Sequence, residues 1–485
     1  MLRFLRSVAA GVACVLVCVV AALAAQEPPV VKPAAKGIEG IWEGPLKVGA
    51  IELRLAFKIK KDADGKLAAT MDSIDQGAKD IPIAEVSFEG GKLTFAALKL
   101  KAKFVGTLAE DGQSIKGEFE QAGLKLPLEL MRVERVSTLN RPQMPKKPFP
   151  YPAEDVTFEN KPAGAKLAGT LTLPKGDGPF PAVVLISGSG PQDRDETLFG
   201  HKPFLVIADH FARNGIAVLR FDDRGVGKSG GKHEGATSAD FATDVHAAVK
   251  FLQGRKEIDS KRIGLMGHSE GGLIAPMVAA DHPDDVGFIV LLAGPGLPGN
   301  EVLRSQQKVI LKAMGMGTEK IEMMQRLQKA AVTAVMKAAP DKMKAEAKDA
   351  VKTFLDSLTE AERKSIGLGK SGDEVTDAIV GRVADPWMAY FFKYDPRPTL
   401  GKVRCPVLAV NGELDLQVVT DENLSAIEKA VKAGGNDSVT VKEFPKLNHL
   451  FQKAKTGLPN EYGQLEETFD PEALKYLTEW VLNQK

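Results

Sequence analysis

A single serine stands among closely spaced glycines in residues 263–275, which read IGLMGHSEGGLIA. Gly267 lies two residues before Ser269, and Gly271 and Gly272 follow it. Glycine costs backbone entropy and packs no side chain, so three glycines around one hydroxyl indicate a geometric requirement. A sharp turn from a strand into a helix has that requirement, because it leaves no room for side chains beside the serine and exposes its hydroxyl at the helix N-terminus. The pattern therefore predicts that Ser269 is a nucleophile.

A serine nucleophile needs a base to take its proton and a carboxylate to orient that base. In sheets with such a turn, the chain order is Ser, then Asp or Glu, then His. His449, in FPKLNHLF, lies beyond the last strand-like runs and is the predicted base. Asp415 follows the strand-like PVLAVNG and is the favoured acid. Glu413 and Asp421 compete with it, although Glu413 comes very soon after the strand and Asp421 is expected to cap the helix DENLSAIEKA.

Backbone amides must also stabilise the negative charge that develops on an attacked carbonyl oxygen. We expect the first donor at Glu270 and the second at Ser189, in the loop SGSGPQDRD that follows the strand-like AVVLI. Gly188 and Gly190 let this loop approach a substrate closely. The charged residues 193–195 are interpreted as ion pairs that brace the loop.

The elements that must position these groups begin at about residue 153. Strand-like runs such as AVVLI, RIGLMG, FIVLLAG and PVLAVNG alternate with helical runs, which predicts an α/β fold with a mostly parallel sheet and helices on both faces. The alternation stops between about 295 and 393, where we expect an inserted helical cap that lies beside the site. Near its end, Trp387 and Phe391 are candidates for lining the pocket of the acyl group, although packing between cap and core would also account for them.

The first 152 residues contain three predicted parts. Residues 1–25 combine two arginines, an apolar run and small residues near a cleavage site, which is typical of a secretory signal peptide; an uncleaved anchor is the alternative. Residues 37–135 alternate apolar and polar side chains between turn signals, which predicts a small antiparallel β domain. The proline-rich residues 136–152 predict an extended linker.

Composition excludes several functions. The 485 residues carry a formal charge of +1 and no basic stripe, so nucleic acid is not an expected partner. Cys405 is the one cysteine outside the predicted signal, so neither an intramolecular disulfide nor a zinc–sulfur site is expected in the mature chain. We expect a secreted or periplasmic protein without stable membrane insertion after signal cleavage, acting on a small molecule without a metal or organic cofactor. The oligomeric state is left open.

Six separated features occur in order over about residues 154–485: a strand, the SGSG loop, DDRGVGKSGG, GHSEGG, GELD and NHLF. Together they resemble the α/β-hydrolase fold, and in particular bacterial secreted serine carboxylesterases whose nucleophile turn reads GHSEGG. The resemblance implies that Ser269, Asp415 and His449 form a catalytic triad, which hydrolyses small acyl esters through an acyl-enzyme. Pro276 departs from the pattern and is expected to kink the helix after the serine.

Two other functions stay open. A serine peptidase of the same fold would use the same triad on amides. An inactive secreted binding protein is the other alternative, although the intact triad disfavours it. The run GVGKSG at residues 225–230 fits a nucleotide-binding pattern, but it continues into GKHEG where a helix should begin. We therefore interpret this run as a structural turn, with Arg224 inside an ion-pair network.

Overall fold

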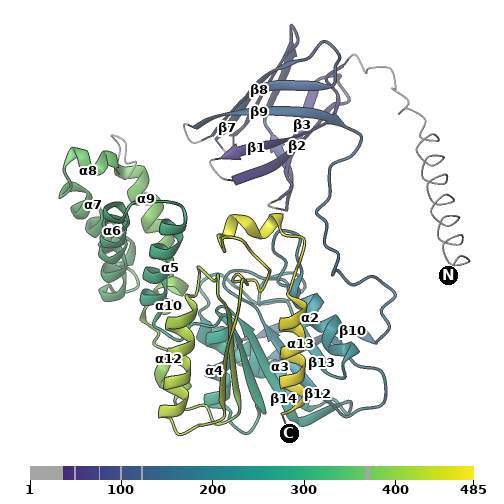
Figure 1. Cartoon of the computed structure of the whole chain (residues 1–485), viewed down its shortest axis with the longest axis vertical. Helices are drawn as coiled ribbons and strands as arrows, with labels where there is room; N and C mark the ends of the chain where they lie inside the picture. The colour runs from purple at the N-terminus through teal and green to yellow at the C-terminus, as the bar shows by residue number, and fades with distance from the viewer. Residues whose placement is uncertain are drawn as a thin grey trace, which may run out of the picture. The chain divides into compact units, whose positions relative to one another are not determined.

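The computed structural model describes residues 37–48, 51–75, 77–98, 101–121, 124–365 and 372–484. The predicted signal peptide, residues 1–25, lies outside them. The chain divides into two compact units, one of Met1–Ile74 with Ala78–Ser137 and one of Asp75–Gly77 with Thr138–Lys485. Figure 1 shows the elements of each unit. Among the described segments, every helix is too short or too polar to span a bilayer.

The first unit is an antiparallel β-sheet, which confirms the prediction from the period-two pattern. Its strands are β1 (Gly40–Val48), β2 (Ile51–Lys61), β3 (Leu67–Ser73), β4 (Ala78–Ile83), β5 (Glu85–Glu89), β6 (Lys92–Ala97), β7 (Ala102–Leu108), β8 (Ser114–Gln121) and β9 (Leu124–Val133). Within the described residues their order is β4-β3-β2-β1-β9-β8-β7-β6-β5. Aromatic side chains fill the core, where the ring of Phe95 lies 4.5 Å from that of Phe57 and 5.1 Å from that of Phe104.

The second unit is organised around a mostly parallel sheet, as the alternation of strands and helices predicts. Its strands are β10 (Ala153–Asn160), β11 (Ala165–Thr172), β12 (Phe180–Ile186), β13 (Ala217–Phe221), β14 (Ile258–His268), β15 (Phe288–Leu292), β16 (Val407–Gly412) and β17 (Val439–Phe444). In the described residues the order is β10-β11-β13-β12-β14-β15-β16-β17. β10 and β11 are antiparallel to their neighbours, and all pairings from β13 to β17 are parallel. The carboxyl ends of the parallel strands therefore share one edge.

Helices cover both faces of this sheet (Figure 1). They are α2 (Pro203–Arg213), α3 (Ser238–Gln253), α4 (Gly271–Asp281), α11 (Arg397–Leu400), α12 (Thr420–Ala433) and α13 (Pro471–Leu482), with a 3-10 helix, η2, at Pro459–Gln464. Apolar side chains of α3, α4 and α12 join one core, and those of α2 and α13 join the other. β12 serves both cores, because Val184 points into the first and Val183 into the second. α4 runs through Pro276 to its end without interruption.

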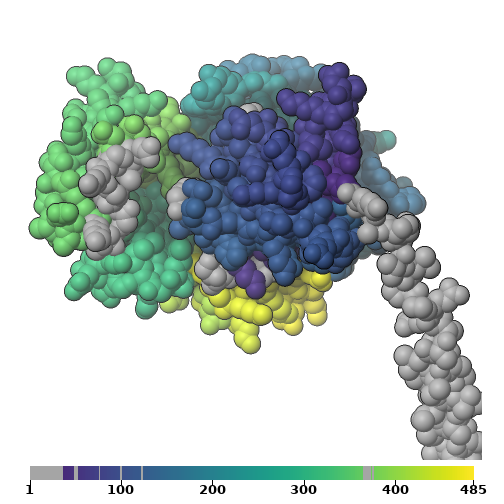
Figure 2. Space-filling model, turned by 90° about the horizontal axis from the view of Figure 1, so that it is seen from above, coloured from purple at the N-terminus to yellow at the C-terminus, as the bar shows by residue number. Residues whose placement is uncertain are grey.

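A helical cap is inserted between β15 and β16, as predicted. It comprises α5 (Gly299–Ala313), α6 (Thr318–Lys337), α7 (Met343–Asp356), α8 (Glu360–Ser365), α9 (Gly372–Val383) and α10 (Pro386–Lys393). The cap has apolar clusters of its own, in which Leu327 packs with Val351, and Val335 with Phe392. Figure 2 shows the cap, coloured green, as a lobe of the molecule. Asp385 caps α10, and its carboxylate accepts the backbone N–H of Trp387 at 2.9 Å.

Candidate active site

Ser269 lies at the turn between β14 and α4. Its φ is 53°, in the left-handed region that residues with a side chain rarely adopt. Its N–H donates to the carbonyl of Leu292 at 2.9 Å, which holds the strained turn against β15. A Cβ at Gly267 would stand 1.9 Å from the carbonyl oxygen of Gly271, and one at Gly271 would stand 2.3 Å from that of Ile186. The two glycines therefore provide clearance for the turn.

Asp415 and His449 meet at the edge formed by the strand ends. Asp415 follows β16 and His449 follows β17, and Nδ1 of His449 lies 2.8 Å from Oδ2 of Asp415. Both side chains are buried. The other carboxylate oxygen accepts the backbone N–H groups of Gln417 and Val418 at 2.8 and 2.9 Å, so the carboxylate is fixed. Because a carboxylate only accepts, Nδ1 carries a proton, and Nε2 of the neutral ring is the acceptor for another proton.

The base is also placed beside the serine turn. The ring of His449 lies 4.8 Å from that of His268, the residue that directly precedes Ser269. Nε2 of His268 lies 3.0 Å from the backbone carbonyl oxygen of His449. The structure thus brings the Asp415–His449 pair to the turn that carries the predicted nucleophile.

The two competing acids lie elsewhere. Glu413 accepts the backbone N–H of Lys446 at 2.8 Å, which directs it to the start of the following loop. The prediction that Asp421 caps its helix is wrong, because the cap residue of α12 is Val419 and Asp421 lies within the first turn. There it still faces the positive end of the helix dipole, which favours an acidic side chain. The ring of His449 bonds to Asp415 instead.

The loop after β12 passes close to Ser269. A Cβ at Gly188 would stand 3.3 Å from Cβ of Ser269, so the absence of a side chain permits this approach. The N–H of Gly188 donates to Oε1 of Glu196 at 2.7 Å and is therefore occupied. The next amide, that of Ser189, stays the predicted second donor to an oxyanion. Glu270, the predicted first donor, is the cap residue of α4, where backbone N–H groups have no partner within the helix.

Ion pairs brace this loop, as interpreted from residues 193–195. Nη2 of Arg194 lies 2.8 Å from Oδ2 of Asp222, at the end of β13, while Asp195 pairs with Arg220 and Lys202. Burial would raise the pKa of Asp222, but hydrogen bonds from Arg194 and from a backbone N–H outweigh it and hold the pKa below its ordinary value.

Arg224 belongs to a second buried network. Its Nε donates to Oδ2 of Asp244 at 2.6 Å, and its Nη2 donates to the backbone carbonyl of Asp240 at 2.6 Å. The turn of residues 225–230 is thus tied to α3 through a charged pair. This agrees with its interpretation as a structural turn.

The side chain of Glu270 has a role that the sequence did not suggest. Its Oε1 accepts hydrogen bonds from Oγ of Ser238 at 2.5 Å and from Nε1 of Trp387 at 2.6 Å. Burial raises the pKa of this carboxyl group, and the two donors oppose that shift. Trp387 stacks on Phe391 with ring centroids 5.6 Å apart. Because Trp387 lies on α10, one hydrogen bond joins the cap to the residue after the predicted nucleophile.

Asp223, a half-buried carboxyl group, holds the loop after β12 by hydrogen bonds. It accepts hydrogen bonds from Oγ of Ser187 at 2.8 Å and from the backbone N–H of Gln192 at 2.9 Å. Burial raises its pKa to about 7 against the effect of these bonds, and the charges of Glu270 and Glu196 add to the rise. The sequence signal that could have identified Asp223 is its position just after a parallel strand, because side chains at that edge of the sheet surround the site.

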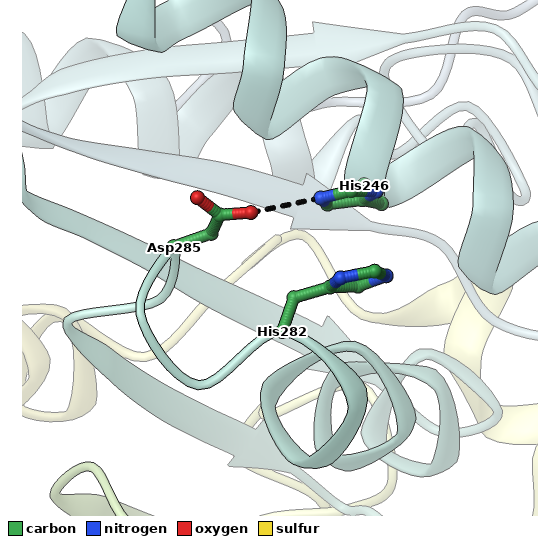
Figure 3. A group of neighbouring side chains, drawn as sticks. All are labelled: His246, His282 and Asp285. Atoms are coloured by element: carbon green, nitrogen blue, oxygen red, sulfur yellow. Dashed lines mark hydrogen bonds and ion pairs between the residues drawn. The ribbon is translucent and has the colours of Figure 1, made fainter.

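A group on the outer side of α3 and α4 has the residue types of a metal site (Figure 3). His246, His282 and Asp285 each offer one ligand atom, and these atoms lie within 4.8 Å of one another. The two rings are stacked 3.5 Å apart with an interplanar angle of 3°, so their lone pairs run side by side and do not converge. Lys250 and Gln253 already bond the carboxylate at 2.8 and 2.9 Å. We interpret the group as a polar cluster that satisfies its own charges.

The family model and two sequence relatives that match this chain are hydrolases. The Hydrolase_4 family model, described as serine aminopeptidase, S33, matches residues 203–357. Esterase EstD from Thermotoga maritima is 30% identical over 382 residues, covering 76% of this chain and 81% of that protein. Esterase FrsA from Enterobacter sp. is 25% identical over 173 residues, covering 36% of this chain and 34% of that protein. The structure of the Pyrococcus furiosus esterase Pf2001 aligns with a TM-score of 0.40 at 16% identity, over 71% of this chain and 99% of that chain.

Proposed function

We propose that this chain is a serine carboxylesterase acting on small acyl esters. The premise is that the chain belongs to the α/β-hydrolase-fold esterases that include Esterase EstD. The observation that carries the proposal is the buried Asp415–His449 pair, bonded at 2.8 Å, beside the left-handed turn of Ser269. A carboxylate, an imidazole and a serine hydroxyl are the parts of a general-base nucleophile.

The proposed acylation uses these groups in turn. Oγ of Ser269 attacks the acyl carbon of the ester while Nε2 of His449 takes its proton. The new C–O bond places negative charge on the former carbonyl oxygen, which the N–H groups of Glu270 and Ser189 stabilise. As the intermediate collapses, the ester C–O bond breaks and His449 gives its proton to the departing alcohol. Asp415 keeps the ring in the required tautomer throughout.

Deacylation repeats the sequence with water. His449 takes a proton from a water molecule that attacks the acyl carbon, the same backbone donors stabilise the oxyanion, and Ser269 recovers its proton as the carboxylic acid leaves. Each donor in an oxyanion hole contributes about 3 to 4 kcal/mol to the transition state, so the loop after β12 matters as much as the acid. These steps use the side chains and amides of this chain together with water.

The cap is proposed to form the wall of the acyl pocket through Trp387 and Phe391. Two observations support this placement. Nε1 of Trp387 lies 2.6 Å from the carboxyl group of Glu270, the residue after the nucleophile. Its ring stacks on that of Phe391 at an interplanar angle of 3°, so the two rings extend one apolar surface from the turn.

A serine peptidase is the second candidate, and the match of residues 203–357 to a serine aminopeptidase model favours it. The two activities can be separated on chromogenic model substrates. We expect short p-nitrophenyl esters to be hydrolysed with a higher kcat/KM, relative to their uncatalysed rates, than aminoacyl p-nitroanilides. Ser269→Ala should abolish both activities. Faster normalised turnover of the anilides would reverse the assignment.

We also propose that the mature protein is secreted or periplasmic, which rests on the composition of residues 1–25. Expression of the full chain in a bacterial host, followed by fractionation and N-terminal sequencing, tests this. A mature terminus near residue 25 in the periplasm or medium is expected. An intact N-terminus in the membrane fraction would indicate the anchor instead.

A further inference from the structure

His268 is a buried histidine that the catalytic steps above do not use. Its Nδ1 lies 2.9 Å from Oε1 of Glu196, and its Nε2 lies 3.0 Å from the backbone carbonyl oxygen of His449. Both side chains of the His268–Glu196 pair are less than 10% exposed. The ring therefore lies between two acceptors and has no room to exchange them for water.

The partners determine the charge of this ring. A carbonyl oxygen only accepts, so Nε2 of His268 must donate to His449. Oε1 of Glu196 already accepts the N–H of Gly188 at 2.7 Å, which favours an ionised carboxylate that accepts from Nδ1 as well. Both ring nitrogens then carry protons, and the ring is an imidazolium. Burial lowers the pKa of His268, but the charge and hydrogen bond of Glu196 outweigh it and leave the pKa raised.

Through these bonds the ring joins the three segments on which the proposed esterase mechanism depends. Glu196 holds Gly188, which precedes the oxyanion donor Ser189; His268 itself precedes Ser269; and the carbonyl that it binds belongs to the base, His449. Glu196 reaches this place from a backbone with φ of 50°, which is costly for a residue with a side chain. Such a backbone conformation persists where the surrounding contacts offset its energetic cost.

We propose that His268 is a positioning residue, a buried imidazolium that with Glu196 fixes the oxyanion loop and the loop of the catalytic base relative to the nucleophile. The inference rests on the proposed serine hydrolase function and adds two residues to it. His268 touches neither substrate nor the reacting atoms, and it acts through Gly188 and His449.

The charges around the ring allow this role. Glu196 faces it from the loop after β12, while His449 and Asp415 face it from the loops after β17 and β16. The charge of Glu196 in turn raises the pKa of Asp223, which lies just after β13. The positive ring and the Glu196 carboxylate cancel at short range, so the pair can lie beside His449 without adding a net charge. Loss of either member leaves the other as an unpaired buried charge, which is strongly unfavourable.

The test compares Glu196→Gln and His268→Gln with a matched surface variant, His282→Gln, in the full protein. Glu196→Gln keeps the shape and the acceptor for Gly188 but removes the charge that keeps His268 protonated. We expect kcat to fall about 10- to 100-fold with KM changed less than about threefold, because a small displacement of catalytic groups costs on this scale. The pH profile of kcat in Glu196→Gln should also acquire a fall at high pH, as His268 loses its proton and one of its hydrogen bonds.

A purely structural role would lower stability without adding this second ionisation to the profile. Variants with kcat within twofold of the wild type and an unchanged pH profile would overturn the proposal. If the wild type itself failed to turn over esters or to react with a fluorophosphonate, the proposed function would fail instead.

Nitrogen NMR of the wild type, labelled at its seven histidines, gives a test that needs no variant. One imidazole should keep protons on both ring nitrogens above the pH at which ordinary histidines become neutral. Seven neutral rings at that pH would overturn the proposal even if the variants did not fold.

Discussion

Asp415→Asn is the sharpest perturbation of the proposed triad, because asparagine has nearly the same shape. Its oxygen can keep the hydrogen bonds from the N–H groups of Gln417 and Val418, which fixes the side chain in place. Its NH₂ group then stands where Oδ2 lies, 2.8 Å from Nδ1 of His449. An NH₂ group donates, so Nδ1 must become an acceptor and the ring proton moves to Nε2. In that tautomer His449 cannot take the proton of Ser269.

The size of the effect follows from two losses. The bond between buried Asp415 and His449 is charge-assisted, and such bonds contribute about 1.5 to 3 kcal/mol, or roughly 10- to 150-fold in rate. The wrong tautomer adds a further loss, and the same substitution in a Ser-His-Asp triad lowers kcat about 10⁴-fold, or roughly 5.4 kcal/mol. We therefore expect kcat to fall by more than 10²-fold and close to 10⁴-fold.

The assay is hydrolysis of p-nitrophenyl acetate and butyrate at a pH where the wild type is fully active. Glu413→Gln and Asp421→Asn are the matched controls, because they neutralise the two acids that compete in sequence but lie elsewhere in the structure. Both should keep kcat within about twofold. A fall of less than tenfold in Asp415→Asn, or a larger fall in either control, would refute the assignment of the acid.

Three further predictions concern the pocket and the stability of the hydrolase unit. Trp387→Ala should raise kcat/KM for longer acyl chains about tenfold relative to acetyl esters, because the space it opens lets two more CH₂ groups be buried, which contributes about 1.6 kcal/mol. Trp387→Phe should change this chain-length profile little. An unchanged profile in both variants would remove Trp387 from the pocket. Burial, with the charge of Arg141 adding, lowers the pKa of His201 to about 4. Between about pH 6.5 and pH 4, His201 therefore binds a proton in the unfolded chain but not in the folded chain. Urea unfolding should show up to about 3 kcal/mol of stability lost as the pH falls through this window. An equally steep loss in His201→Gln would contradict this cause. Arg224→Met leaves the buried carboxylate of Asp244 with the amide of Asn160 but without its charged partner, which should cost about 3 to 5 kcal/mol in the same assay. A cost below about 1 kcal/mol would show that the pair is not needed.

Local patterns in the sequence determined much of the fold. α3 spans Ser238–Gln253, and the sequence favours a helix there because Phe241, Val245, Val249 and Leu252 recur at helical spacing. The turn at Ser269 was recognisable because three glycines within six residues indicate a backbone that side chains would obstruct. Asp415 and His449 were placed by topology, since residues that follow parallel strands meet at one edge of the sheet.

Contacts between distant side chains were not predictable in the same way. The bond from Trp387 to Glu270 spans 117 residues, and that from His268 to Glu196 spans 72. No period or motif specifies where such side chains point, because the GHSEGG pattern constrains the backbone of the turn and leaves its charged side chains open. The failed cap at Asp421 has a related cause. α12 begins at Thr420, one residue before Asp421. The hydroxyl of Thr420 donates to the carbonyl of Gly412, a contact outside the local sequence.

The most direct test of the central claim is labelling of the mature protein with a fluorophosphonate, followed by peptide mapping of the adduct. An activated serine reacts with this reagent, whereas an ordinary surface serine does not. We expect one adduct, on Ser269, that is lost in Ser269→Ala and forms much more slowly in Asp415→Asn. Folded protein that acquires no adduct, or an adduct at another serine, would contradict the claim that Ser269 is the nucleophile.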